Sequence, residues 1–485
     1  MRKYLNYVGG EWVPAAAGAV FETRNPADAR ELTAQYASSG KIDTGAAIEA
    51  ARKAFPVWSG LTAVARGRFL SKASQVLEGR KQETAEFLTR EEGKTIAESQ
   101  GEVQRAIDVF RFFGGLSYTL GGQTIPHDLP NNLLYTVRQP LGVVALITPW
   151  NFPIAIPAWK LAPALAVGNT VVMKPASQAP GCALELAKAL QDAGLPKGVF
   201  NVVTGEGGAA GGELCVHPAI MAMSFTGSYE IGRKIHRQVS ERMVRAQMEM
   251  GAKNPTIVLA DADLELAVNL IVKAGFGLTG QACTATSRVI AERPIVAALT
   301  EKLVARANSL KVASGMLPSA EMGPAVSRSQ LESNLAHVAQ AKAEGARLLC
   351  GGARLTEEPF VHGHFMAPTL FDQVTPTMRI ANEEVFGPVI AILAVDSFEE
   401  AISVANGADT GLSATLVSRD LRKAMLYAER IEAGVVKINQ ISTGLALQAP
   451  FGGVKHSSTD SFKEQGAGAI EFYSRLKTVY LDYTS

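Results

Sequence analysis

The chain has 485 residues, 47% of them hydrophobic and 19% charged, with a formal net charge of +1. A single core rarely grows beyond about 250 to 300 residues, so this length predicts two or three domains. Because 47 basic residues balance 46 acidic ones, the composition argues against nucleic acid or an anionic membrane as a partner. The start lacks the apolar segment of a signal peptide, and no stretch has the roughly 20 apolar residues of a membrane span, so we expect a cytoplasmic protein.

Helical periodicity in the first part of the chain gives way to an alternating pattern. From Thr44 to about Phe113, apolar residues recur at three- and four-residue spacing. Short apolar runs then alternate with helix-like segments. We expect strands at 142–149, 170–175, 200–205 and 222–227, and helices at 157–167, 181–193 and 228–240. This alternation predicts a parallel sheet with crossover helices, a layout typical of nucleotide binding.

A second series of the same kind begins at residue 255, and we place a domain boundary near residue 251. Its strands are expected at 255–263 and 389–395, and its helices at 264–277, 296–309 and 328–344. Residues 129–140 are expected to form an extended hairpin, and SRLKTVYLDYTS at the end of the chain a strand. Because neither has an obvious place in an α/β core, both are candidates for contacts between subunits.

Four cysteines are spread along the chain: Cys182, Cys215, Cys283 and Cys350. They are too few for a disulfide framework and form no CxxC pair, so we expect no metal site. Three have apolar neighbours typical of buried thiols. Cys283 instead lies among small polar residues in GLTGQACTATSR, with glycines before it and Arg288 behind it. A catalytic thiol needs a partly exposed, electropositive or helix-terminal setting, although a free cysteine is more often a small hydrophobe.

Two further motifs carry polar side chains, one directly after an expected strand and the other at the expected domain junction. In TPWNFP (148–153), the Asn151 amide could donate to a developing oxyanion, or it could simply cap the next helix. In MEMGAKNP, Glu249 could act as a general base for water, or it could be an ordinary solvated carboxylate.

Three motifs favour a dinucleotide. TVVMKPAS places Lys174 and Ser177 after a strand, where a ribose could rest. FTGSYEIG turns a strand into a helix at Ser228, so the first N–H groups can meet a pyrophosphate. TGEGGAAGG contains a G-x-G-x-x-A pattern around Gly207, which a flexible turn would explain equally well.

Taken in order, these stretches resemble the aldehyde dehydrogenase superfamily from Gly10-Glu11-Trp12 to the C-terminal strand. The matching motifs are PWNFP, VVMKPAS, FTGS, EMGAKNP, GQACTATSR, EEVFGP and PFGGVKHSS. The resemblance implies an α/β fold with a Rossmann-like coenzyme domain, an α/β catalytic domain and a small β oligomerisation element. The implied ranges are 1–119 and 141–250 for the first, 251–449 for the second, and 120–140 and 466–485 for the third. It also implies a homo-oligomer, either a dimer or a tetramer.

The resemblance implies a role for each catalytic candidate. Cys283 matches the family's nucleophile, whose thiolate attacks an aldehyde carbonyl. The Asn151 amide and the Cys283 backbone N–H would hold the oxyanion. Hydride transfer to a nicotinamide would leave a thioester, which water activated by Glu249 would hydrolyse.

Cofactor positions also follow from the matched motifs. The resemblance implies that Lys174 bonds the adenine ribose, Ser228 the pyrophosphate and Glu384 the nicotinamide ribose, with Phe386 beside the nicotinamide. Where NAD-preferring members often carry glutamate, this chain has Ser177, which would not repel a 2′-phosphate. We therefore expect NADP to be accepted as well as NAD. The positions expected to contact the cofactor are Trp150, Lys174, Ser177, Gly207, Ser228, Glu384 and Phe386.

SSTDSFKEQG (457–466), WNFPIAIPAWK and LQAPFGG resemble the branch that oxidises 2-oxoglutarate semialdehyde, also called 2,5-dioxopentanoate. Trp159, however, stands where succinic-semialdehyde enzymes usually carry an arginine. An anionic substrate would then need Ser457, Ser458 or Arg111.

The alternatives are an aromatic or aliphatic aldehyde, or succinic semialdehyde. The side chains that could line an apolar tunnel are Phe112, Phe113, Phe152, Trp159 and Phe451. The presence of Glu249 argues against a CoA-acylating enzyme. A non-enzymatic scaffold is disfavoured because the thiol, the base and the oxyanion donor are all present.

Overall fold

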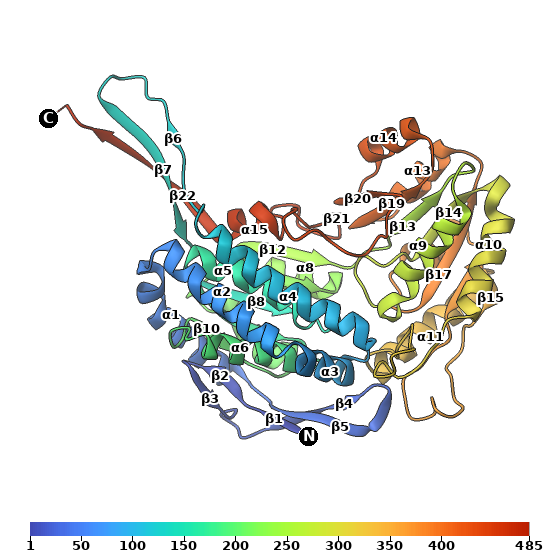
Figure 1. Cartoon of the computed structure of the whole chain (residues 1–485), viewed down its shortest axis with the longest axis horizontal. Coiled ribbons are helices and arrows are strands. Elements are labelled where there is room, and N and C mark those ends of the chain that lie inside the picture. Colours follow the sequence, from blue (N-terminus) through green and yellow to red (C-terminus); the bar gives the residue numbers. More distant parts are fainter. Residues whose placement is uncertain (485) are drawn as a thin grey trace.

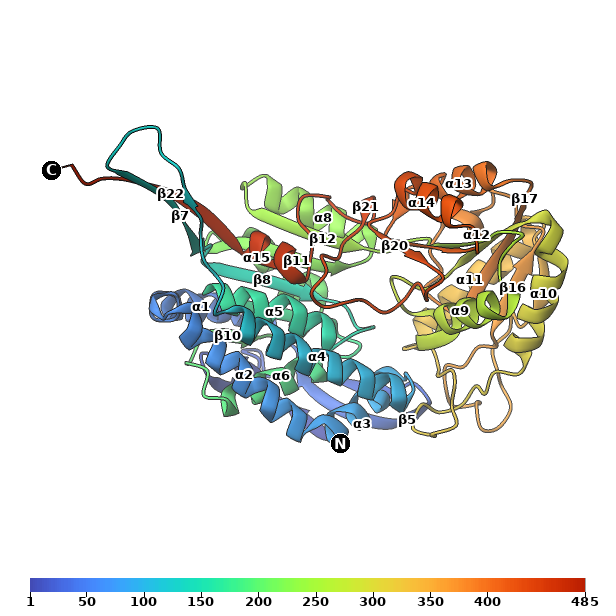
Figure 2. The same ribbon diagram turned by 45° about the horizontal axis from the view of Figure 1, so that its top comes forward.

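A computed structural model describes residues 1–484 and contains two bodies of sheet and helix, with a narrow arm extending from one of them (Figure 1). The segment that follows the second body in sequence returns between the two bodies, as the red loops in Figures 1 and 2 show. Within residues 1–484, none of the helices combines the length and the apolar character needed to cross a bilayer.

The first body is built on a seven-stranded sheet in the order β12-β11-β8-β9-β10-β2-β3. Five strands run parallel, and β2 pairs antiparallel with both of its neighbours. The strands are β2 (Asn6–Val8), β3 (Glu11–Val13), β8 (Val143–Thr148), β9 (Thr170–Pro175), β10 (Phe200–Val202), β11 (Ile220–Gly227) and β12 (Arg245–Met250). Its central strands are near-continuous apolar runs because helices cover both faces.

Helices form a layer on each face of this sheet. On one face lie α2 (Ala63–Gly79), α3 (Lys81–Glu92), α4 (Ile96–Leu116), α5 (Ala155–Val167) and α6 (Gly181–Asp192). On the other lie α1 (Lys41–Gly60), α7 (Gly212–Val216) and α8 (Tyr229–Ser240). Because its sequence is apolar almost all round, α5 is buried over its whole length between the sheet and α4.

The second body has a seven-stranded sheet in the order β15-β16-β17-β14-β13-β19-β20, parallel except for β15. Its strands are β13 (Pro255–Val258), β14 (Arg288–Glu292), β15 (Arg347–Cys350), β16 (Thr369–Asp372), β17 (Val389–Val395), β19 (Ser413–Val417) and β20 (Val435–Ile438). One face packs on α9 (Leu264–Phe276) and α10 (Arg293–Asn308). The other packs on α11 (Arg328–Ala343), α12 (Arg379–Asn382), α13 (Phe398–Asn406) and α14 (Leu421–Arg430). The boundary expected near residue 251 falls between β12 and β13, which belong to different sheets.

The arm is a third, antiparallel sheet of β6 (Thr124–Ile125), β7 (Asn132–Pro140) and β22 (Ser474–Asp482). Figure 1 shows β7 and β22 leaving the first body together, with the C-terminal end of the chain beyond β22. The range 466–485 expected for this element starts too early. Residues Gly466–Tyr473 form helix α15, whose apolar side chains lie in the core of the first body against α5.

Strands in the first 40 residues were missed by the sequence analysis. Besides β2 and β3, this segment forms a three-stranded sheet of β1 (Arg2–Tyr4), β4 (Val20–Asn25) and β5 (Asp28–Ala37). β1 has three residues, too few for an alternating pattern, and it pairs with residues 34–36, so its stability depends on non-local contacts. Two more two-residue strands, β18 (Thr410–Gly411) and β21 (Val454–Lys455), pair with each other.

Candidate active site

The predicted site residues meet at the carboxyl ends of four neighbouring strands. In the order β12-β11-β8-β9, these ends carry Glu249, Ser228, Asn151 and Lys174. The order of connection reverses between β8 and β11, because β9 follows β8 on one side and β12 follows β11 on the other. Such a reversal opens a crevice at the carboxyl edge, where α/β proteins bind their ligands.

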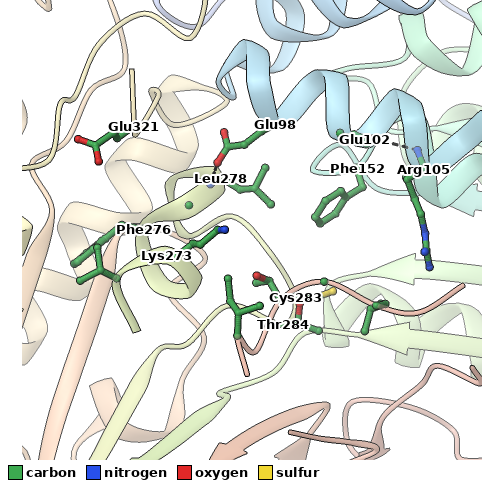
Figure 3. A pocket seen from close by; sticks show the side chains of 18 of the residues that line it. Glu98, Glu102, Arg105, Phe152, Lys273, Phe276, Leu278, Cys283, Thr284 and Glu321 are labelled. Atoms are coloured by element: carbon green, nitrogen blue, oxygen red, sulfur yellow. Dashed lines mark hydrogen bonds between the residues drawn. The ribbon is translucent and has the colours of Figure 1, made fainter. Parts of the chain in front are cut away.

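Two cavities meet at Cys283. The larger, of about 800 Å³, lies between α4, α9 and the returning C-terminal segment, and the smaller, of about 210 Å³, lies at the strand ends of the first sheet. Cys283 and Trp159 line both. Figure 3 shows Cys283 in the larger cavity, with Phe152 and α4 on one side and α9 on the other. A thiol in this position can face a substrate from one cavity and a cofactor from the other.

The backbone before Cys283 is strained and held from outside. In the 3₁₀ turn η2 (Gly277–Gly280), Leu278 and Thr279 have φ values of 53° and 57°, in the left-handed region that L-residues rarely adopt. The Leu278 N–H donates to Glu98 at 2.7 Å, and the Thr279 hydroxyl donates to the Gly323 carbonyl at 3.0 Å. These contacts with other elements stabilise a turn that the local sequence would not favour.

The surroundings of Cys283 are acidic, and so differ from the electropositive setting that is one of those favouring a catalytic thiol. Burial raises the pKa of its thiol, and the negative charges of Glu384, Glu249 and Glu464 raise it further. Arg288 is buried elsewhere and donates to the carbonyls of residues 253, 404 and 405. The thiol therefore stays protonated at neutral pH in the free protein, because no cation stabilises the thiolate.

Asn151 ties the loop after β8 to the cysteine turn. Its amide nitrogen donates to the Gln281 carbonyl at 2.9 Å, and it is buried. A side-chain amide has two N–H groups, so one remains for another acceptor. The backbone carbonyl of Asn151 accepts from the Lys94 ammonium at 2.6 Å. Both ends of the residue are thus held in place.

Lys94 and Glu102 support this loop and were missed by the sequence analysis. Lys94 is fully buried, pairs with Glu102 at 2.6 Å and lies 4.7 Å from the centre of the Phe152 ring. The other oxygen of Glu102 accepts from the N–H groups of Ile154 and Ala155 at the start of α5. A lysine and a glutamate eight residues apart give no signal of pairing in sequence, because a turn separates α3 from α4.

Glu249 is a buried carboxyl with hydrogen-bond donors on both oxygens. Gly453 N–H donates at 3.0 Å and the Ser458 hydroxyl at 3.1 Å. Burial, together with the negative charge of Glu464, raises the pKa of Glu249 to about 8. It is therefore largely protonated at pH 7 and becomes a base as the pH approaches 8.

Glu464 belongs to a buried network that the sequence analysis also missed. It pairs with Lys160 and accepts from the Trp159 indole N–H at 2.7 Å. Lys160 also donates to the Ser224 hydroxyl at 2.7 Å. The Trp159 indole is therefore already engaged, and its ring packs beside Phe451.

On the adenosine side of the proposed cofactor site, Lys174 has only carbonyl partners. Its ammonium donates to Pro175 at 2.6 Å and to Gly205 at 3.0 Å, and burial lowers its pKa to about 8. The Ser177 hydroxyl donates to the same Gly205 carbonyl at 2.7 Å, so in this structure its proton points away from any ligand. Gly207 begins an exposed turn just beyond and lines neither cavity.

The smaller cavity is lined by four of the residues expected to contact the cofactor: Trp150, Ser228, Glu384 and Phe386. The Trp150 and Phe386 rings meet edge to face at 5.3 Å. Ser228 precedes α8 without making a side-chain capping bond, which leaves the helix N-terminus open to an anion. Glu384 accepts from the Ala252 N–H at 2.9 Å, and burial raises its pKa to about 7. These groups fit a dinucleotide: an open helix start for phosphate, a carboxyl for a ribose and aromatic rings for the base.

Glycine is required at position 251 of this cavity. A Cβ there would lie 1.9 Å from a Glu384 oxygen, so any side chain would displace that carboxyl. The neighbouring Ala252 leaves the carboxyl in place and supplies its N–H donor.

Several expected substrate contacts are placed elsewhere. Ser457 is buried, donates to the Gly251 carbonyl and accepts from the Gly411 N–H, and it lines neither cavity. Ser458 is engaged by Glu249. Arg111 points to solvent and pairs with Glu78 and Asp108.

The aromatic candidates divide between core and cavity. Phe113 is buried in the core of the first body, and Phe112 packs against the same core. Phe152 and Trp159 line the larger cavity, and Trp159 and Phe451 the smaller one. The larger cavity is also lined by Arg105, which the sequence analysis did not single out. Arg111 follows it by six residues and so lies about 120° away around the same helix.

Fold and site together define the class of protein: the chain belongs to the aldehyde dehydrogenase family, whose model matches residues 12–479. It is an enzyme that oxidises aldehydes with a nicotinamide dinucleotide, and the sequence-based expectations of family and fold are confirmed.

Individual relatives cover the whole chain. It is 48% identical over 478 residues to the alpha-ketoglutarate semialdehyde dehydrogenase of Haloferax volcanii, with 99% of each chain covered. It is 42% identical over 482 residues to the 2,5-dioxopentanoate dehydrogenase of Saccharolobus solfataricus, again with 99% of each covered. The solved structure of betaine aldehyde dehydrogenase from Staphylococcus aureus in complex with NAD⁺ matches with a TM-score of 0.96 at 33% identity, covering 99% of this chain and 95% of that one.

Proposed function

We propose that this enzyme oxidises 2-oxoglutarate semialdehyde to 2-oxoglutarate, with Cys283 as nucleophile, Asn151 as oxyanion donor and Glu249 as general base. The observation that carries the catalytic assignment is that Cys283 lines both cavities, so a single sulfur can face substrate and cofactor. The substrate assignment is supported by the names and identities of the relatives from Haloferax volcanii and Saccharolobus solfataricus.

In the first half of the reaction, the Cys283 thiol loses its proton to solvent water, and the resulting thiolate sulfur adds to the aldehyde carbon. The carbonyl oxygen becomes an oxyanion, which the free N–H of the Asn151 amide and the Cys283 backbone N–H stabilise. A bound nicotinamide dinucleotide supplies the acceptor for the hydride that leaves this carbon. The product on Cys283 is then a thioester.

In the second half, Glu249 takes a proton from water as the water oxygen attacks the thioester carbon. The carbon–sulfur bond breaks, the carboxylic acid is released and the Cys283 thiolate is regenerated. Glu249 is suited to this step because its raised pKa places its conversion from acid to base near working pH.

We propose that the enzyme accepts NADP as well as NAD. Trp150, Lys174, Ser228, Glu384 and Phe386 would hold the dinucleotide. Ser177 adds no negative charge beside the adenine ribose, and Lys174 has only carbonyl oxygens as partners. A 2′-phosphate bound there would lie near the Lys174 ammonium, and Ser177 brings no carboxylate that would repel it.

We also propose a cytoplasmic homo-oligomer, dimer or tetramer, assembled through the arm. β7 and β22 expose large apolar side chains, among them Leu133, Val137, Leu476 and Tyr480, and such a surface favours a partner. All four cysteines are free, as expected in a reducing compartment.

The proposed substrate is tested by comparing kcat/KM for 2-oxoglutarate semialdehyde, succinic semialdehyde, benzaldehyde and hexanal, each with NAD and with NADP. A lead of about a hundredfold for the oxo-acid semialdehyde would support the proposal, since a charged hydrogen bond supplies that much discrimination. The larger cavity is lined in part by Phe152, Trp159, Phe276 and Leu278, so a lead for benzaldehyde or hexanal would favour the apolar alternative.

A further inference from the structure

Arg105 places a cation in the wall of the larger cavity. It lies on α4 three residues after Glu102 and seven after Glu98, and all three side chains line this cavity. This spacing puts them on one face of the helix. In Figure 3, Glu98 and Arg105 leave the same helix, with Phe152 between them and Cys283 lower in this view.

The charge of Arg105 has no carboxylate partner among residues 1–484. Its guanidinium donates to the side-chain carbonyl of Gln465, a neutral acceptor. The other cavity cations differ from it: Arg306 pairs with Glu321, and Lys273 is exposed to solvent. Partial burial lowers the pKa of Arg105, because removal from water disfavours its charge. A half-buried guanidinium with free N–H groups is a strong site for a planar carboxylate.

The neighbouring carboxylates leave room for an anion. Glu102 is paired with Lys94, so its charge is compensated. Glu98 accepts from the backbone N–H groups of Thr95 and Leu278. The other groups considered for this task are engaged elsewhere. Ser457 donates to Gly251 and Ser458 to Glu249, and Arg111 pairs with carboxylates at the surface.

We propose that Arg105 binds the carboxylate of the substrate and thereby determines specificity for a semialdehyde of an oxo acid. This inference rests on the proposed function, in which the aldehyde carbon reacts at Cys283 and the carboxylate lies at the far end of the same molecule. Both residues line the same cavity, in which an extended substrate would have to reach from one to the other. The bidentate geometry of arginine suits this carboxylate better than a lysine would.

The test compares three variants with the wild type: Arg105→Met, which removes the charge but keeps most of the stem, Arg105→Lys, which keeps the charge, and Lys273→Met as the matched control. Lys273→Met removes another cation of the same cavity. The first readout is kcat/KM for 2-oxoglutarate semialdehyde and for hexanal. The second is the inhibition constant of pentanoate, which has a carboxylate but no aldehyde.

We expect Arg105→Met to lower kcat/KM for the semialdehyde by about 10- to 150-fold, mainly through KM, and to weaken pentanoate inhibition. Hexanal turnover should change by less than about threefold, because hexanal has no carboxylate to lose a partner. Arg105→Lys should have a kcat/KM for the semialdehyde between those of the wild type and Arg105→Met. Lys273→Met should stay within about twofold of the wild-type kcat/KM on both substrates.

Each other outcome is decisive. Equal losses on both aldehydes in Arg105→Met would assign Arg105 a structural role and overturn the proposal. The proposal would also be overturned if the preference for the semialdehyde over hexanal were lost only in Lys273→Met, or were retained in both Arg105→Met and Lys273→Met. If the wild type itself does not prefer the semialdehyde over hexanal, the proposed substrate fails whatever the variants do. Hexanal activity and the thermal midpoint show that each variant has folded.

Discussion

The side-chain amide of Asn151 donates to the backbone carbonyl of Gln281, and this 2.9 Å bond joins the loop after β8 to the turn that carries Cys283. The proposed oxyanion donor and the proposed nucleophile, 132 positions apart in sequence, are thus fixed relative to each other before any substrate arrives. Such preorganisation matters because a donor already in place needs no reorganisation when charge develops.

Asn151→Ala should lower kcat by about 10²- to 10³-fold, because it removes an oxyanion donor and a bond to the cysteine turn. Steady-state kinetics with hexanal and with the semialdehyde would measure it. Cofactor binding, followed by fluorescence titration, serves as the control and should change little. A loss in cofactor affinity equal to the loss in kcat would contradict the assignment.

Cys283→Ala should abolish oxidation while cofactor binding stays nearly intact.

The reactivity of the wild-type Cys283 thiol towards an alkylating reagent should depend steeply on pH. Burial and three carboxylates raise its pKa, so alkylation of the free protein should accelerate about tenfold per pH unit between pH 7 and 9. Glu384→Gln removes the carboxylate that raises this pKa the most, and it should accelerate alkylation further. Mass spectrometry separates Cys283 from Cys350, whose rate should not respond to that substitution.

Glu249→Gln should leave acylation largely intact and slow the release of acid. In the wild type, the rate of thioester hydrolysis should rise with pH up to about 8, where the carboxyl ionises. In single-turnover experiments the variant should show a burst of reduced cofactor followed by a slow phase. A burst absent from the variant would mean that Glu249 acts before the thioester forms.

The same glutamate has a predictable effect on stability. Its pKa in the folded protein lies above the ordinary value of 4.5, so folding favours the protonated form. The stability it contributes is full below pH 4.5 and is lost as the pH rises through about 8. The free energy of unfolding of Glu249→Gln, measured relative to that of the wild type, should therefore increase as the pH rises from 5 to 9. Denaturant unfolding at several pH values would check this, and a constant difference would show that the pKa is not raised.

Ser177→Glu should weaken NADP binding by at least about tenfold more than NAD binding, because a carboxylate would repel the 2′-phosphate. Dissociation constants for both cofactors measure this, with Ser177→Gln as the uncharged control of equal size. Equal losses for the two cofactors would show that another residue contacts the 2′-phosphate.

Lys94→Met should lower the free energy of unfolding by about 3–5 kcal/mol, because it leaves Glu102 buried without its cation. It should also lower kcat, since the Asn151 carbonyl loses its donor. Lys94→Met combined with Glu102→Gln, which removes the carboxylate charge but keeps an oxygen for the Ile154 and Ala155 N–H groups, should recover part of the stability but not kcat. Recovery of both would show that Lys94 does not position Asn151.

The sequence by itself determined the family, the alternation of strands and helices from residue 142 onward, and the strand ends at which Asn151 and Lys174 lie. These follow from local properties: apolar runs of strand length, glycine and proline at turns, and motifs that occupy consecutive positions. Cys283 was singled out because its neighbours are small and polar.

Only the tertiary structure decided what surrounds these residues. It brought Glu249, Glu384 and Glu464 to the thiol and so made its surroundings acidic, although the basic residue next in sequence is Arg288. It also directed Arg105, rather than Arg111, into the cavity with Cys283. Charges and cavity walls come from segments far apart in the chain, and no local pattern records how such segments pack.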